Sequence, residues 1–157
     1  MKRIFLTVIL TVSLLPLLAQ NTFYEKYAKT EGITKVYISK SLLSLFKGNS
    51  SVDLGTDRVD ISGVTSKLTG IYVLSTEKQS VAQAMQKDFE ALLKKGSYEL
   101  LMEVEDDEDN CVIYLSRDAQ WIRDIYICAQ DSSSFNVIQI SGMLTDEDLN
   151  QIVAMTE

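Results

Sequence analysis

The most acidic stretch of the chain, EVEDDEDNC (Glu103–Cys111), is the first place to look for a metal site. An EF-hand loop needs oxygen ligands at alternate positions, a glycine at the sixth position and a bidentate acid at the twelfth. Counted from Asp106, those two positions hold Cys111 and Arg117. The stretch therefore predicts the turn of a β-hairpin, in which Asp and Asn are favoured residues. Weak, adventitious calcium binding is the alternative.

A second candidate is an S-x-x-K motif at Ser75 and Lys78, because helical spacing can bring a lysine amine to a serine nucleophile. The companion S-D-N and K-T-G elements of penicillin-binding enzymes are missing from the sequence, and the stretch SLFK fits the same short motif. We therefore expect Ser75 or Thr76 to cap the following helix, with Gln79 at capping-box spacing from Thr76.

The two cysteines, Cys111 and Cys128, lie on consecutive predicted strands. With an even number of residues in the turn between them, antiparallel pairing places both on one face of the sheet, opposite or diagonal. Oxidising conditions outside the cytosol permit a disulfide, but a register shift of two would exceed the ~7 Å bridging limit between Cα atoms. Two buried free thiols are the preferred prediction, and a disulfide is the alternative.

Two further groups of residues could contact a ligand. Asp53, Asp57, Arg58 and Asp60 lie in the polar stretch NSSVDLGTDRVD, which a solvated loop explains equally well. Trp121 and the seven tyrosines could form a glycan-stacking surface. Most of these aromatic residues have core-facing spacing, so we expect them to pack.

The composition excludes several classes of function. The chain has no histidine, which removes the usual general base near neutral pH, the Ser-His and Cys-His nucleophile pairs and the histidine-containing zinc sites. It has no glycine-rich phosphate loop. A formal net charge of −7, with no basic stripe, disfavours nucleic acid and anionic membrane surfaces as partners. No cofactor is indicated.

The first residues predict a secretory signal peptide. Lys2 and Arg3 precede the apolar run Ile4–Leu18, and Ala19 supplies a small residue for cleavage. The run is short for a membrane-spanning helix and contains Pro16 near its end. No cysteine follows the run closely, so lipid anchoring through such a residue is not expected.

Removal of residues 1–19 leaves residues 20–157, which we expect to form one domain without a membrane anchor. Loss of two basic residues lowers the formal net charge from −7 to −9. The expected location is the periplasm or the extracellular space.

Hydrophobic periodicity predicts the elements that hold these residues. Helices are expected at about 21–30, 41–48, 59–68 and 81–95, and after Thr145; strands are expected at 33–39, 70–76, 98–105, 111–116, 121–129 and 135–141. Strand 98–105 should carry its apolar residues on one face and Glu99, Glu103 and Glu105 on the other. The three later strands are apolar on both faces, so helices should cover part of each face.

The expected fold class is α+β, with two βα units, a four-strand antiparallel meander and a C-terminal helix, and with the helices packed on the sheet. Four segments together resemble a family of small exported Bacteroidetes proteins, the domain of unknown function 4252 family. These segments are GITKVYISKSLLSLF, GVTSKLTGIYVLST, the hairpin YELLMEV to CVIYL, and FNVIQISGMLTDEDL. The resemblance implies a compact exported domain and supplies no catalytic residue.

The sequence thus favours an exported, non-enzymatic domain that binds an envelope protein or a small ligand. One alternative is an enzyme that uses two carboxylates, such as a glycan hydrolase. Another is a structural or assembly component whose exposed strand edges pair with a second chain. No catalytic, cofactor-binding or metal-binding residue is predicted.

Overall fold

The computed structural model describes residues 22–45, 51–53, 58–60, 62–107 and 109–154. The predicted signal peptide, residues 1–19, lies outside this part of the chain. The element order is α1 (Thr22–Tyr27), β1 (Thr34–Ser39), α2 (Lys40–Leu45), β2 (Ser51–Asp53), β3 (Arg58–Asp60), α3 (Ser62–Thr65), β4 (Leu68–Thr76), α4 (Gln79–Lys95), β5 (Tyr98–Glu105), β6 (Asn110–Asp118), β7 (Trp121–Gln130), β8 (Phe135–Leu144) and α5 (Asp146–Ala154).

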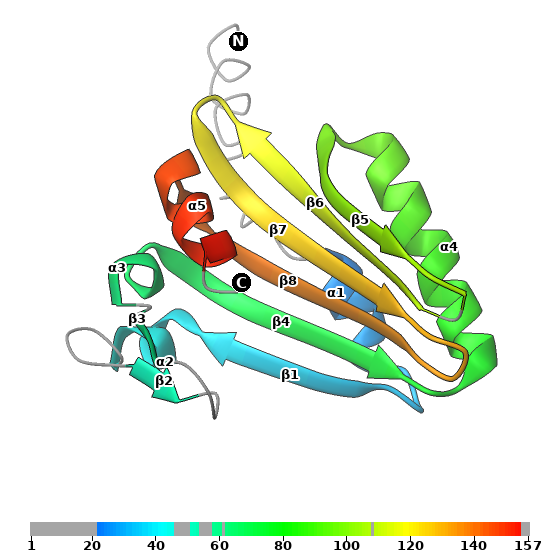
Figure 1. Cartoon of the computed structure of the whole chain (residues 1–157). Coiled ribbons are helices and arrows are strands. Elements are labelled where there is room, and N and C mark those ends of the chain that lie inside the picture. The colour runs from blue at the N-terminus through cyan, green and yellow to red at the C-terminus, as the bar shows by residue number, and fades with distance from the viewer. Residues whose placement is uncertain (1–21, 46–50, 54–57, 61, 108, 155–157) are drawn as a thin grey trace, which may run out of the picture.

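Six strands form one antiparallel sheet in the order β1-β4-β8-β7-β6-β5 (Figure 1). The α+β class is therefore confirmed. The arrangement as two βα units before a meander is not matched in detail, because β1 pairs antiparallel with β4 and β4 pairs with β8. The early strands and the late ones thus form a single sheet. The stretch predicted as a polar loop contains a small separate hairpin, β2-β3.

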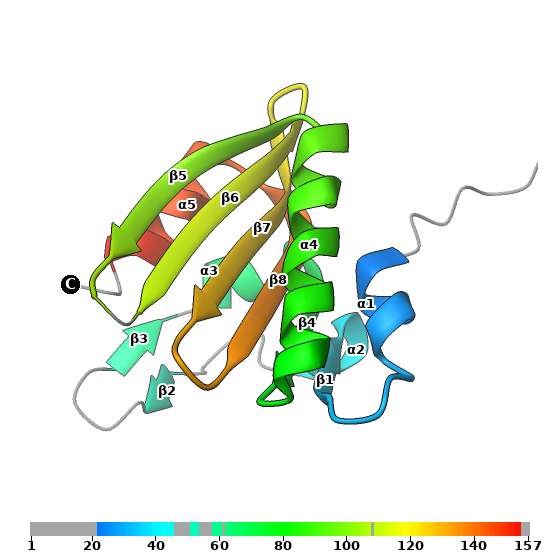
Figure 2. The same cartoon turned by 90° about the vertical axis from the view of Figure 1, so that its right-hand side faces the viewer.

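One side of the sheet, here called the helix face, is covered by α4 and α1 (Figure 2). The predicted apolar stripe of α4 places Met85 and Phe89 in the core against Leu74, Tyr126 and other strand residues. Full burial of side chains of this size contributes about 1.5–3 kcal/mol each. The side chain of Asp88 on α4 accepts hydrogen bonds from Lys26 and Tyr27, which fastens α1 to α4.

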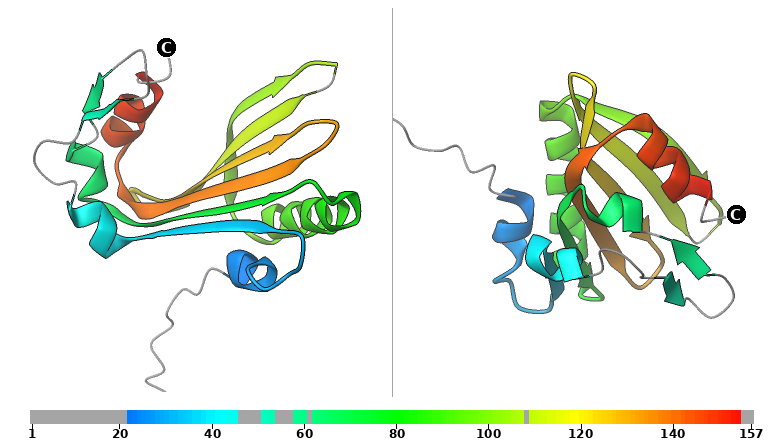
Figure 3. Two further views of the ribbon diagram at one scale, coloured as in Figure 1. Left: turned by 90° about the horizontal axis from the view of Figure 1, so that it is seen from below. Right: turned by 90° about the vertical axis from the view of Figure 1, so that its left-hand side faces the viewer.

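The opposite side, here called the open face, carries α5 and α3 near one end of the sheet (Figure 3). These helices and α2 bury a second cluster that includes Leu43, Val64, Leu115, Ile122 and Leu149. The prediction that helices cover part of both faces is therefore confirmed. In the part of the chain that the structure describes, no helix is long and apolar enough to cross a membrane.

Helix α5 begins where the sequence predicts, at a reciprocal cap. The Asp148 carboxylate accepts from the backbone N–H and hydroxyl of Thr145, both at 2.8 Å, and the Asp148 N–H donates to the Thr145 hydroxyl at 3.3 Å. Lys67, in the turn between α3 and β4, donates to both carboxylate oxygens at 2.6 and 2.8 Å. This ion pair joins α5 to the start of β4.

Two expected helix features are wrong. The helix predicted at 59–68 has only one turn, α3, because β4 already begins at Leu68. Helix α4 has Lys78 as its N-cap residue, with no side-chain cap. The Thr76 hydroxyl instead donates to the carbonyl of Gly32 at 2.7 Å and accepts from the backbone N–H of Lys78 at 3.1 Å, so it holds the strand-to-helix turn.

Candidate binding surface

One row of side chains crosses all six strands on the open face. Direct pairing in the strand register joins its members in a line, from one edge of the sheet to the other. The row, here called the central row, consists of Val36, Val73, Ile138, Ile127, Ile113 and Met102. Five strand spacings of ~4.8 Å make it about 24 Å long. Every member is aliphatic or methionine, so the row is a continuous apolar strip.

The central row is only partly covered. Val36 and Met102 are 44% and 43% exposed, and the four residues between them are intermediate in exposure. In Figure 1, α5 lies in front of one end of the sheet, and no described helix lies in front of the other end. Antiparallel sheets commonly place polar side chains on the face that is not packed. Monomeric proteins rarely leave long apolar strips exposed, so the partly exposed central row is the candidate binding surface among the described residues.

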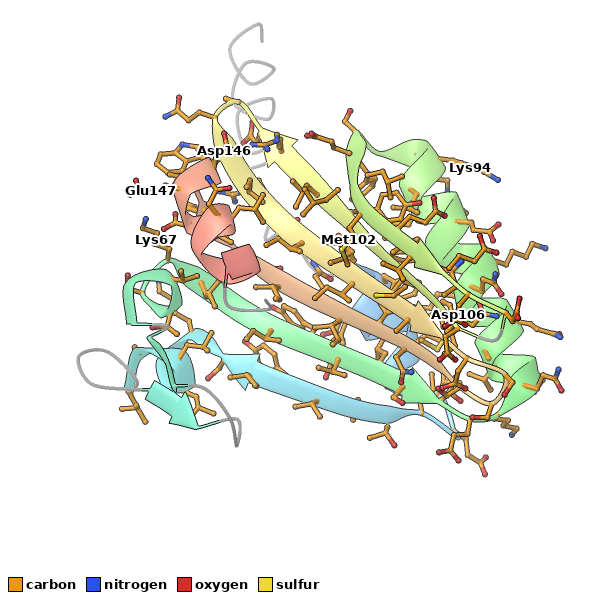
Figure 4. The ribbon with its side chains drawn as sticks, in the orientation of Figure 1. Lys67, Lys94, Met102, Asp106, Asp146 and Glu147 are labelled. Carbon is orange, nitrogen blue, oxygen red and sulfur yellow. The ribbon has the colours of Figure 1, made fainter. Side chains whose placement is uncertain are left out.

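A β-bulge decides which residues of β5 lie on the open face. The register shifts between Leu100 and Met102, so Leu100 pairs with Tyr114 on the helix face and Met102 pairs with Ile113 on the open face. The prediction that the apolar residues of this strand share one face is therefore wrong. Because of the shift, both faces of β5 carry exposed apolar side chains. Figure 4 labels Met102 on the side of the sheet that carries α5.

A second bulge separates the two cysteines. The turn pairs Asp118 with Trp121, and this register, if continued, would place Cys111 directly opposite Cys128. The irregularity at Arg123 shifts the register by one, so Cys111 pairs with Ala129 on the open face. Cys128 then lies on the helix face, and the same-face prediction is wrong. Both thiols are free in the structure, and burial raises the pKa of Cys128 to about 12.

The acidic stretch forms the turn between β5 and β6, as predicted. The Asp106 carboxylate accepts from the Asp109 N–H at 2.9 Å, and the Asp106 N–H donates to the Asp109 carbonyl at 2.9 Å. A hollow of about 260 Å³ lies beside this turn. Its lining includes Val104 and Cys111 of the open face, together with Asp106, Asp109 and Asp131. Among the described residues, no group of three His, Cys, Asp or Glu side chains is placed to hold a metal ion.

The S-x-x-K residues do not form a nucleophile pair. Ser75 remains in strand β4, and its hydroxyl donates to the side-chain oxygen of Asn136 at 2.5 Å. Lys78 is exposed at the start of α4. The helical spacing that the motif requires is thus absent at this position, because the chain leaves the sheet between the two residues.

A hollow of about 450 Å³ on the helix side contains two carboxylates, Glu77 and Asp131. Asp131 accepts four hydrogen bonds from the N–H and hydroxyl groups of Ser133 and Ser134, at 2.6–2.8 Å. These hydrogen bonds hold the pKa of Asp131 far below its usual value. A carboxylate that is so fully engaged in its own turn is a poor general acid or nucleophile.

A polar group lies on the helix face at the end of β7 and β8. Asp124 accepts from Gln139 at 2.9 Å and from Ser141 at 2.6 Å. Burial raises the pKa of the neighbouring Tyr126, with the charge of Asp124 as a further cause. These hydrogen bonds join neighbouring strands within the fold, so we interpret the group as structural.

The remaining candidates contribute little to a site. Most tyrosines pack in or against the helix-face core, as predicted, whereas Tyr37 is 53% exposed and stacks on Tyr72 with ring centroids 4.9 Å apart. Trp121 begins β7 and is partly buried. Asp53, Arg58 and Asp60 belong to the hairpin β2-β3, and Asp57 lies outside the described residues.

The central row was missed from the sequence because it joins residues of six strands that are far apart in the chain. The available signal was the apolar composition of both faces in β6, β7 and β8.

Comparison with known proteins gives a match to a family model: the model described as Domain of unknown function (DUF4252) covers residues 24–152. No curated protein and no solved structure matches the chain.

Proposed function

The chain belongs to the DUF4252 family, and we propose that it is a non-catalytic binding domain whose central row contacts an apolar surface of a partner. The observation that carries this proposal is the partly exposed row of six aliphatic and methionine side chains. Contact with a partner would remove this surface from water. The transfer is favourable by about 25 cal/mol for each Å² of apolar area that is buried.

The rigidity of the sheet supports such a role. Each strand of the row is paired along its length, and the helix face behind it is a packed core that includes Leu74, Val137 and Tyr126. A surface that is already ordered loses little conformational entropy when it binds. The row is therefore suited to a partner that meets it as a preformed strip.

We propose further that the domain acts after export, in the periplasm or outside the cell, without residues 1–19. The charged and apolar pattern of the first nineteen residues supports this proposal. N-terminal sequencing of the protein from an envelope or culture fraction tests it. A mature chain that begins at or next to Gln20 is expected, and an intact Met1 in the cytoplasmic fraction would contradict it.

Site-specific photo-cross-linking tests the binding surface. A photoreactive phenylalanine analogue at Val73 or Ile138 should give adducts in the cells that make the protein. The same analogue at Ala84 or Lys87, which are exposed on α4, should not. Circular dichroism of each variant controls for folding. The same adducts at both pairs of positions, or none at the first pair, would refute the proposed surface.

A further inference from the structure

Strand β5 is one edge of the six-stranded sheet, and it is unusually apolar for an edge. Its neighbour in the sheet order is β6 alone, so one row of backbone N–H and C=O groups is left without a sheet partner. Leu100, Leu101, Met102 and Val104 are between 40% and 53% exposed. Natural edge strands are usually short or protected by charge, and a long apolar edge readily accepts another strand.

The same strand is strongly acidic on one face. Glu103 pairs with Val112 and Glu105 with Asn110, so both carboxylates lie on the helix face. Neither has an ion-pair partner among the described residues. Glu90 of α4 lines the same hollow as Glu103. This side of the edge therefore carries uncompensated negative charge, in contrast to Glu99, which pairs with Arg117 at 3.0 Å.

The turn that ends β5 adds negative charge on the other face. The hollow there has Val104, Cys111 and Ala129 in its lining, and its aspartates are Asp106, Asp109 and Asp131. Figure 4 labels Asp106 at this end of the β5-β6 hairpin. The end of the edge therefore carries negative charge on both faces, which favours a basic segment over an acidic one.

From these observations we propose that the β5 edge binds an extended segment of a partner protein as an added strand. The segment alternates apolar residues on the open face with lysine or arginine on the helix face. Its apolar residues would extend the central row beyond Met102, and its basic residues would lie opposite Glu103 and Glu105. Main-chain hydrogen bonds supply affinity in this mode, and the alternate side chains supply specificity. The proposal rests on the proposed function in that it continues the same apolar surface.

A second copy of the chain fits this edge poorly. When two copies of β5 pair around a two-fold axis near Glu103 or Val104, Glu103 meets Glu103 or Glu105 of the other copy. Like charges directly opposite each other destabilise a strand pair. A basic segment of a different protein has the complementary charge, so it is the occupant that the edge favours.

The test uses labelled heptapeptides with blocked ends, KVKVKVK and EVEVEVE, and measures binding to the protein by fluorescence anisotropy. The lysine peptide should bind and the glutamate peptide should bind at least tenfold more weakly, because two cross-strand charge pairs are replaced by repulsion. The double variant Glu103→Lys, Glu105→Lys should reverse this preference. The variant Glu25→Lys, Glu31→Lys has the same change in net charge at exposed positions in α1 and before β1, and it should behave as the wild type.

Three results would overturn the proposal. The first is equal binding of the two peptides to the wild-type protein. The second is unchanged binding of a lysine peptide that is N-methylated at alternate residues, because such a peptide keeps its charge and cannot pair as a strand. The third is a concentration-dependent oligomer of the free protein that Glu103→Lys, Glu105→Lys dissociates, because the occupant would then be a second copy. If the peptides do not bind as expected but cross-linked adducts at Val73 remain, only the proposal for the β5 edge is refuted. If the peptides bind but those adducts are missing, the proposal for the central row is refuted.

Discussion

Replacement of Asp148 by alanine should loosen α5 and lengthen the uncovered part of the open face. Asp148 is 3% exposed, and its carboxylate accepts from Lys67 and from the N–H and hydroxyl of Thr145. Truncation of one member of a buried ion pair costs ~3–5 kcal/mol. The Lys67 side chain is 41% exposed and can be hydrated in the variant, so the lower end applies. We predict a loss of about 3 kcal/mol in the free energy of unfolding.

This loss should depend on pH in a defined direction. Burial alone would raise the pKa of Asp148, but the hydrogen bonds from Lys67 and Thr145 outweigh it and hold the pKa below its usual value. A carboxyl group with a lower pKa in the folded state contributes stability above its unfolded pKa, and this contribution is lost as the pH falls through the folded pKa. The difference between wild type and variant should therefore be constant from about pH 5 to 8 and shrink below about pH 4.

Urea unfolding followed by the fluorescence of Trp121, at pH 7 and pH 3, measures both effects. The control is Asp146→Ala, because the Asp146 side chain is 72% exposed and its ion pair with Arg117 should contribute less than about 1 kcal/mol. The binding of an apolar dye should increase in Asp148→Ala and not in the control. A loss below about 1 kcal/mol at pH 7, or an equal difference at pH 3, would refute the account of this anchor.

Three further predictions concern the two faces of the sheet. In the folded protein Cys111 should react with a thiol reagent. Cys128 should react only after unfolding, because it is buried and its pKa is raised to about 12. A denatured, unreduced chain without free thiols would contradict this prediction. Val137→Thr should lower the free energy of unfolding by about 2 kcal/mol, since Val137 is 3% exposed. Ile138→Thr on the open face should cost less than half as much. Equal losses in urea unfolding would be evidence that the open face is as buried as the helix face. Gly142→Ala should cost ~1–3 kcal/mol, because its Cβ would lie 2.8 Å from a backbone carbonyl oxygen, and an unchanged melting temperature would disprove this.

Local patterns predicted much of the fold. The stripe and the C-terminal lysines of α4 predicted its core side and its end at Lys95. Thr145 and the acids after it predicted the start of α5. These features depend on neighbours within one turn of helix, so the sequence alone contains them. The start of α4 was misplaced because the Thr76 hydroxyl bonds to Gly32, a residue 44 positions away.

The candidate surface depended on features that local patterns do not contain. The bulges at Leu101 and Arg123 lie in apolar or mixed strands, without a glycine or proline to mark them. A shift of one residue moves every later side chain to the other face. The two bulges place Met102 on the open face and separate Cys111 from Cys128, and neither result follows from strand periodicity.

Solvent exposure of the isoleucine methyl groups in the isolated, monomeric protein tests the central claim most directly. A soluble paramagnetic agent should broaden the methyl NMR signals of Ile113, Ile127 and Ile138, which are partly exposed in the central row. The signals of Ile122 and Ile125, which are buried beside α5, should change little. Equal protection of both groups would show that the row is covered within the monomer, and it would contradict the claim that the open face is available to a partner.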